Sequence, residues 1–105
     1  MALAPLTLAA AAFAYAVGGF WMKRSAGATH PGATAVFLAL FTLGAVLQAR
    51  GMRGADLSVA YIVVLGLEAV AAVGLGTVVL HEPLTAPRVV AVLLILAGVV
   101  WLQRT

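Results

Sequence analysis

The chain has 105 residues, of which 65% are hydrophobic and 9% are charged, and its mean hydropathy is +1.17. A soluble domain carries about 25% charged residues, so this chain lacks the charge to cover a water-facing surface. The net charge of +3 rests mostly on basic residues in short connections, which is typical of membrane flanks and argues against a nucleic-acid partner.

Four continuously apolar segments predict a single four-helix transmembrane domain over residues 1–105. The expected spans cover about residues 3–22, 32–49, 57–80 and 89–103. A helix needs about 20 apolar residues to cross a bilayer. β-Barrel strands are excluded because apolar and polar residues do not alternate. The first segment lacks a basic leader and ends at Lys23 and Arg24, so we interpret it as a retained span rather than a signal peptide.

The basic residues divide evenly between the two ends of a four-span bundle. One end carries Lys23, Arg24 and Arg88, and the other carries Arg50, Arg53 and Arg104. The positive-inside bias that normally sets orientation is therefore absent. This balance predicts insertion in both orientations and an antiparallel, dual-topology dimer. The alternative is that so few charges carry no orientation signal, and that a partner or the order of the inserted loops sets the orientation.

Glu68 is the acidic residue of the third segment, within "LGLEAVAAVGLG" (65–76). An acid at the centre of a membrane helix costs roughly 2.5 to 3.5 kcal/mol, and such residues usually face the bundle interior or a wet cavity. A carboxyl at that depth can hold a proton or a cation in turn, which is the basis of exchange. The alternative is a protonated acid that only bonds another helix or a backbone carbonyl.

The candidate binding residues are Glu68, Tyr61, Tyr15 and Val64. Helical spacing places Tyr61, Val64 and Glu68 on one face of the third helix, with Tyr61 about 10 Å from Glu68. The tyrosine ring offers a cation–π contact. We expect Tyr15 to reach the same cavity from the first helix and to hydrogen-bond Glu68. For both tyrosines the alternative is packing or an interfacial position.

Gly66, Gly74 and Gly76 are expected to let the third helix bend, which would help expose a midplane site to each face in turn. The alternative is that glycine is simply common in membrane helices. In the connection that follows, we expect Glu82 to pair with Arg88.

The sequence contains no pattern that predicts an enzyme, a metal or a cofactor. It has no cysteine, and its histidines, His30 and His81, lie in separate connections with too few neighbouring ligands for a metal. It also lacks a glycine-rich phosphate loop and a nucleophile–base constellation. We therefore expect no catalytic residues, no metal site and no cofactor.

Three stretches together resemble the small multidrug resistance transporters, a family within the drug/metabolite transporter superfamily. "AVGGFWMKRSAG" (16–27) resembles the end of the family's first helix, with its Met-Lys-x-Ser-x-Gly pattern. "ADLSVAYIVVLGL" (55–67) resembles the entry into its third helix. "LHEPLTAPRVVAVLLILAGVVWL" (80–102) resembles the Glu-x-Leu turn and the glycine-bearing fourth helix. The resemblance covers nearly the whole chain.

This resemblance implies a compact antiparallel dimer in the inner membrane that works by alternating access. Members of the family exchange protons for cationic, often aromatic, compounds or for guanidinium-type substrates. The family's dimer contact lies in the fourth helix and maps here to Ala91, Leu94, Gly98 and Val99. The tyrosine that lines the family's binding chamber maps to Tyr61.

The chain departs from the family pattern at three positions. Tyr15 stands where the family has its carboxylate in helix one, and Val64 stands where it has a tryptophan. Glu68 replaces a glycine of the third helix, so an acid is present on a different helix.

These residues lead to one functional hypothesis and three alternatives. The hypothesis is proton-coupled export of a small or lipophilic cation, with Glu68 as the carboxylate that binds either the proton or the substrate. The expected partners are the lipid bilayer, the cationic substrate and a second copy of the chain. The alternatives are one subunit of a heterodimer with a related four-span protein, a lipid-carrier or metabolite translocator, and a membrane scaffold.

Overall fold

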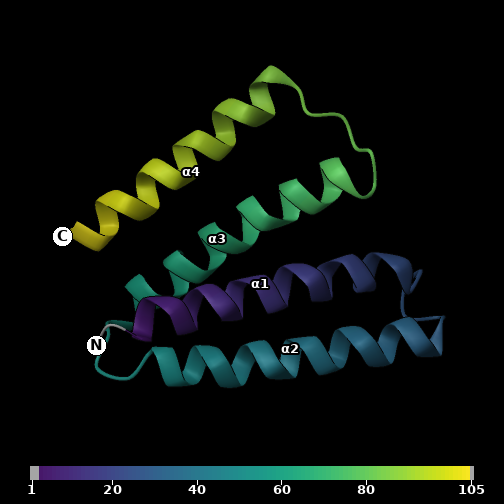
Figure 1. Ribbon diagram of the computed structural model, residues 1–105, viewed down its shortest axis with the longest axis horizontal. Coiled ribbons are helices and arrows are strands. Elements are labelled where there is room, and N and C mark those ends of the chain that lie inside the picture. Colours follow the sequence, from purple (N-terminus) through teal and green to yellow (C-terminus); the bar gives the residue numbers. More distant parts are fainter. Residues whose placement is uncertain (1–2, 105) are drawn as a thin grey trace.

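The computed structural model describes the backbone of residues 3–104 and the side chains of residues 6–104. The described residues form the helices α1 (Leu3–Arg24), α2 (Pro31–Gly51), α3 (Leu57–Val78) and α4 (Ala86–Arg104). Figure 1 shows how they are arranged. Each contains a stretch long and apolar enough to cross a membrane, and residues 3–104 include no strand. The prediction of an all-α membrane protein with four spans is confirmed.

The helix ends follow local chemistry rather than the limits of the apolar runs. Pro31 opens α2, where its missing N–H loses no hydrogen bond. The helix α3 ends at Val78, earlier than the expected span, because the backbone turns there and His81 adopts a left-handed φ of 58°. The helix α4 begins at Ala86, before its apolar run, and the Thr85 hydroxyl accepts the Arg88 N–H at 3.4 Å.

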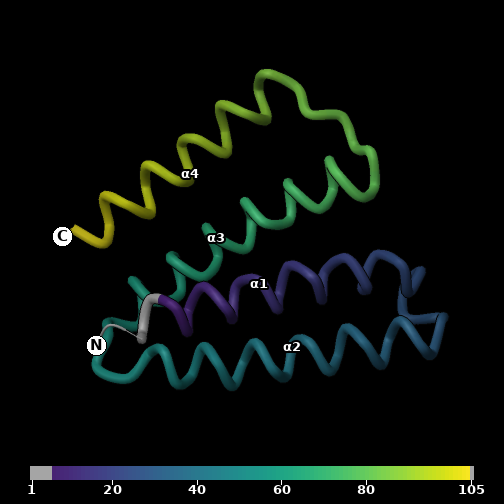
Figure 2. The backbone as a smooth tube through the Cα atoms, in the orientation of Figure 1, coloured from purple at the N-terminus to yellow at the C-terminus, as the bar shows by residue number. Residues whose placement is uncertain are grey.

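The chain is arranged as two helical hairpins, α1–α2 and α3–α4, which the backbone trace in Figure 2 shows most directly. α1 packs extensively against both α2 and α3, whereas α4 packs only against α3 among the described helices. The core lies where α1 meets α3 and is formed by Leu8 and Ala12 from α1 with Ala60 and Val64 from α3. Small side chains at this contact let the two backbones approach closely.

Glycines on α2 bring α1 and α2 together. Gly44 faces the ring of Tyr15, and a Cβ atom at Gly44 would lie 2.7 Å from the Tyr15 Cε1 atom. Gly51 faces Leu8 in the same way. A methyl group at either position would meet a side chain of α1, so both glycines are required for the observed packing distance.

Gly66 has the same packing role between α3 and α4, where it faces Val99 and Ile95. The helix α3 runs without interruption through Gly66, Gly74 and Gly76, and the predicted contribution of these glycines to bending stays a prediction. A Cβ atom at Gly74 would meet no neighbour within 4 Å, and Gly76 faces the Glu82 side chain.

The predicted dimer-contact residues fall into two groups in the structure. Val99 is buried, at 6% exposure, against Gly66 of its own chain. Ala91, Leu94 and Gly98 are exposed. Val99 therefore already has an intramolecular contact, and the role of the other three in a dimer stays a prediction.

Candidate functional site

Two cavities lie along the interface that α1 forms with α3. The first cavity, of about 210 Å³, includes Tyr15, Lys23, Glu68, Leu80 and Glu82 in its wall. The second cavity, of about 350 Å³, is bounded by residues of α1, α2 and α3. Its full lining is Tyr15, Phe41, Ala45, Gln48, Tyr61, Val64, Leu65 and Glu68. Tyr15 and Glu68 line both cavities and so mark the boundary between them.

All four candidate binding residues line the second cavity: Tyr15 from α1, and Tyr61, Val64 and Glu68 from α3. Val64 is almost fully buried at 1% exposure and packs into the core behind the cavity. Tyr61 is 49% exposed, so its side chain lies at the open side of the second cavity. The helical spacing that placed three of these residues on one face thus corresponds to one continuous wall.

Tyr15 does not form the expected hydrogen bond to Glu68. Its hydroxyl donates to the Gln48 Oε1 atom at 2.9 Å, and its ring makes an edge contact with Phe41 at a centroid distance of 5.9 Å. The reason is the close approach of α2, because Gly44 lets the Tyr15 ring lie directly against that helix. The expectation was wrong because it considered only the residues of α1 and α3.

Gln48 is the functional candidate that the sequence reasoning missed. It is buried at 8% exposure near the end of α2 and contributes its amide to the second cavity. A signal was present in the sequence, because Gln48 is a polar side chain within the apolar run "TLGAVLQA" (42–49). A polar group at such a position is expected to find a partner inside the bundle.

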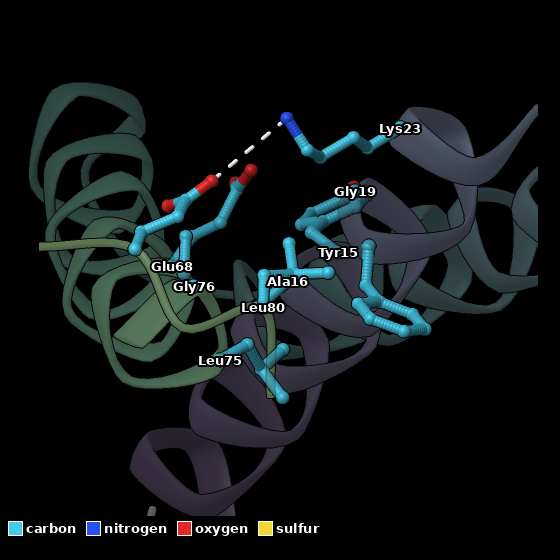
Figure 3. Close-up of a pocket in the computed structure, with 11 residues that line it drawn as sticks. Tyr15, Ala16, Gly19, Lys23, Glu68, Leu75, Gly76 and Leu80 are labelled. Carbon is cyan, nitrogen blue, oxygen red and sulfur yellow. Dashed lines mark ion pairs between the residues drawn. The ribbon is translucent and has the colours of Figure 1, made fainter. Parts of the chain in front are cut away.

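The Glu68 carboxylate has no hydrogen-bond or ion-pair partner among residues 3–104. Figure 3 shows its side chain reaching the first cavity from α3, while Tyr15 and Lys23 reach it from α1. The described residues contain no cluster of three or more side chains that could hold a metal ion. The site therefore offers an unpaired carboxylate next to open space.

An ion pair joins two of the residues that line the first cavity. The Lys23 Nζ atom lies 3.8 Å from the Glu82 Oε2 atom, marked by the dashed line in Figure 3. The expected pairing of Glu82 with Arg88 is wrong, since Arg88 Nη1 donates to the Pro83 carbonyl oxygen at 2.7 Å. The Glu82 N–H bonds the Gly76 oxygen at 2.9 Å, and this contact folds the Glu82 side chain back over α3 toward α1.

Comparison with known families identifies the chain. The model of the Small Multidrug Resistance protein family matches residues 3–95, which include α1, α2, α3 and the first half of α4. The chain belongs to this family. No curated protein matches the chain in a direct comparison. The resemblance noted in the sequence is confirmed.

Family membership and the four spans together describe a multi-pass membrane protein of the small multidrug transporter type. In this small multidrug resistance protein the carboxylate shared by the two cavities, that of Glu68, comes from α3, and α1 contains no acidic residue. α1 contributes the Tyr15 phenol to the same place. The acid and the phenol thus approach the cavities from two different helices.

Proposed function

We propose that this protein exchanges protons for a small or lipophilic cation across the inner membrane, and that Glu68 binds each of them in turn. The observation that supports this is the position of Glu68 on both cavities without a hydrogen-bond or ion-pair partner among residues 3–104. A carboxyl group that carries a proton cannot also neutralise a cation. Mutually exclusive occupancy of one group is sufficient to couple the two movements.

The two cavities extend toward opposite ends of the bundle. The first includes Lys23, at the end of α1, and Leu80, just beyond the end of α3. The second includes Gln48, near the end of α2, and Tyr61, near the start of α3. Since successive helices run in opposite directions, these two pairs lie toward opposite membrane faces. A group between two such cavities is suited to alternating access.

The chemistry of the second cavity favours a cation. Tyr15, Phe41 and Tyr61 contribute aromatic rings to its wall, and Glu68 contributes the acidic group. Aromatic faces attract cations through the ring quadrupole, more strongly where water is excluded. A volume of about 350 Å³ falls at the lower end of the range for small-molecule sites, about 300 to 1,000 Å³.

We further propose that the working unit is an antiparallel, dual-topology homodimer. The even division of basic residues between the two ends of the bundle supports insertion in both orientations. The exposed apolar surface of α4, with Leu94 at 68% exposure, supports a contact with another copy. Because each copy is a single four-helix domain, two copies would together enclose a larger polar pathway than one.

The decisive experiment measures substrate-driven proton flux with a pH-sensitive dye trapped in liposomes that contain the purified chain, using a panel of aromatic and guanidinium cations across pH. We expect substrate-dependent proton flux from the parent chain and flux at the level of empty liposomes from Glu68→Gln. Asp56→Asn is the matched control, because Asp56 is also acidic but lies in the connection before α3 and lines neither cavity. Unchanged coupled flux in Glu68→Gln would refute the proposal.

The same assay separates the alternatives. A heterodimer subunit would be silent alone and active only after reconstitution with a related four-span protein. A lipid or metabolite translocator would ignore the cation panel. A scaffold would show no substrate-dependent proton flux with any partner. Activity of the purified chain alone supports the homodimer.

A further inference from the structure

The Tyr15 side chain shares cavity walls with two hydrogen-bond acceptors, the Gln48 amide oxygen and the Glu68 carboxylate. Tyr15 and Glu68 are the residues that the two cavities share, so the phenol and the carboxylate lie next to the same open space. Gln48 is the other acceptor and lines the second cavity only. A phenol has one O–H to donate, so a bond to Gln48 excludes a bond to Glu68.

The structure resolves this competition in favour of Gln48. The Tyr15 hydroxyl donates to the Gln48 Oε1 atom at 2.9 Å, and Gln48 is buried at 8% exposure. The Tyr15 ring is held on one side by Phe41 and on another by the glycine at position 44. The hydrogen bond and the ring contacts thus both hold the phenol against α2.

The choice of acceptor matters for the carboxylate. A hydrogen bond donated to a carboxylate stabilises its charged form and so opposes protonation. The titratable side chains that share the cavities with Glu68 are Tyr15 and Lys23 from α1, Tyr61 from α3 and Glu82 from the connection after α3. Within residues 6–104, α2 and α4 contribute no titratable side chain to either cavity.

We propose that Gln48 is a positioning residue that retains the Tyr15 hydroxyl and thereby keeps it from donating to Glu68. The carboxylate is then free to take a proton or a cation. If Gln48 is removed, the Glu68 carboxylate is the acceptor that lines both cavities together with the phenol. This inference rests on the proposed function, in which Glu68 alternates between the two occupants.

The test follows the protonation of Glu68 directly and does not require transport. The infrared C=O band of a protonated carboxyl is titrated against pH in the purified chain in lipid, and the Glu68 contribution is assigned by its loss in Glu68→Gln. We expect Gln48→Leu to lower the pH at which half of Glu68 is protonated by about one unit, the size expected when a carboxylate gains one hydrogen-bond donor. Gln48→Met gives a second variant of similar length if the leucine variant folds poorly.

The double variant Tyr15→Phe with Gln48→Leu carries the decisive comparison. It lacks both the acceptor and the released hydroxyl, so its midpoint should return to that of Tyr15→Phe alone. A purely structural effect of Gln48→Leu, such as loosened packing, would persist in the double variant. Gln103→Leu is the matched control, because the Gln103 side chain is exposed near the end of α4 and lines neither cavity.

Two results overturn the inference: a midpoint that Gln48→Leu and Gln48→Met leave unchanged, or a shift that Tyr15→Phe does not reverse. Both results can be obtained whether or not the proposed function holds, since the infrared titration reports on Glu68 even if the chain does not transport. Where transport is measured as well, the pH profile of cation exchange should move in the same direction as the titration. If the parent chain showed no coupled flux, that result would count against the proposed function alone.

Discussion

The first and last helices, α1 and α4, are both apolar membrane spans but differ in what surrounds them. α1 contacts both α2 and α3, and its Ala11 and Ala12 are almost completely buried. α4 contacts α3 alone, and Val99 is its buried side chain among the described residues, while Trp101 is 74% exposed. Hydropathy does not explain this difference, because apolar side chains gain little by leaving lipid for protein.

Small residues on both partners explain the difference. Along α1 and α2, alanines and glycines recur at the contact, so the backbones approach and the larger side chains interlock. Between α3 and α4 the close contact centres on Gly66 and Val99 and leaves beside it an open apolar groove of about 550 Å³. The polar site is consequently built by α1, α2 and α3.

The largest effect is expected from Gly44→Ala, at the close contact between α1 and α2. The added methyl would lie 2.7 Å from the Tyr15 ring, which Phe41 and Gln48 prevent from moving away freely. We expect a loss of about 1 to 3 kcal/mol in unfolding free energy, measured by denaturant titration in micelles. Gly32→Ala, on the same helix with open space around it, is the control. Equal stability of the two variants would contradict the described packing.

An intermediate effect is expected from Gly98→Leu, on the open α4 surface. A Cβ atom at Gly98 meets nothing within 4 Å, so the substitution should leave the unfolding of the single chain unchanged. If α4 forms the contact between copies, the dimer dissociation constant should rise about tenfold, which corresponds to about 1.4 kcal/mol. Cross-linking or energy transfer between labelled copies in liposomes measures the dissociation constant. An unaltered dimer would place the contact elsewhere.

The smallest effect should come from Gly66→Ala, the counterpart of the first substitution in the loosely packed half. The new methyl would collide with Val99, but α4 packs against no other described helix and can move outward. We expect a loss below about 1 kcal/mol, because relaxation relieves overpacking. Gly74→Ala on the same helix meets no neighbour and serves as control. A loss as large as that of Gly44→Ala would show that α4 is held more firmly than its contacts indicate.

Much of the candidate site was predictable from the third helix alone. The regular spacing of Tyr61, Val64 and Glu68 was sufficient to place them on one wall, since a helix repeats every 3.6 residues. Contacts between helices were not predictable in this way. The partner of Tyr15 is Gln48, and that of Glu82 is Lys23, because glycines at positions 44 and 76 leave room for these side chains.

The sequence by itself determined the class of this protein. Its apolar runs and scarce charges leave four membrane helices as the structure that satisfies every backbone hydrogen bond in lipid, and its ordered motifs identify the family. Only the tertiary structure decided which helices enclose the acid, that two cavities meet at Tyr15 and Glu68, and that Gln48 accepts the hydrogen bond of the Tyr15 hydroxyl. The reason is that hydropathy is nearly equal around each helix, so the contacts depend on where small residues on two helices coincide.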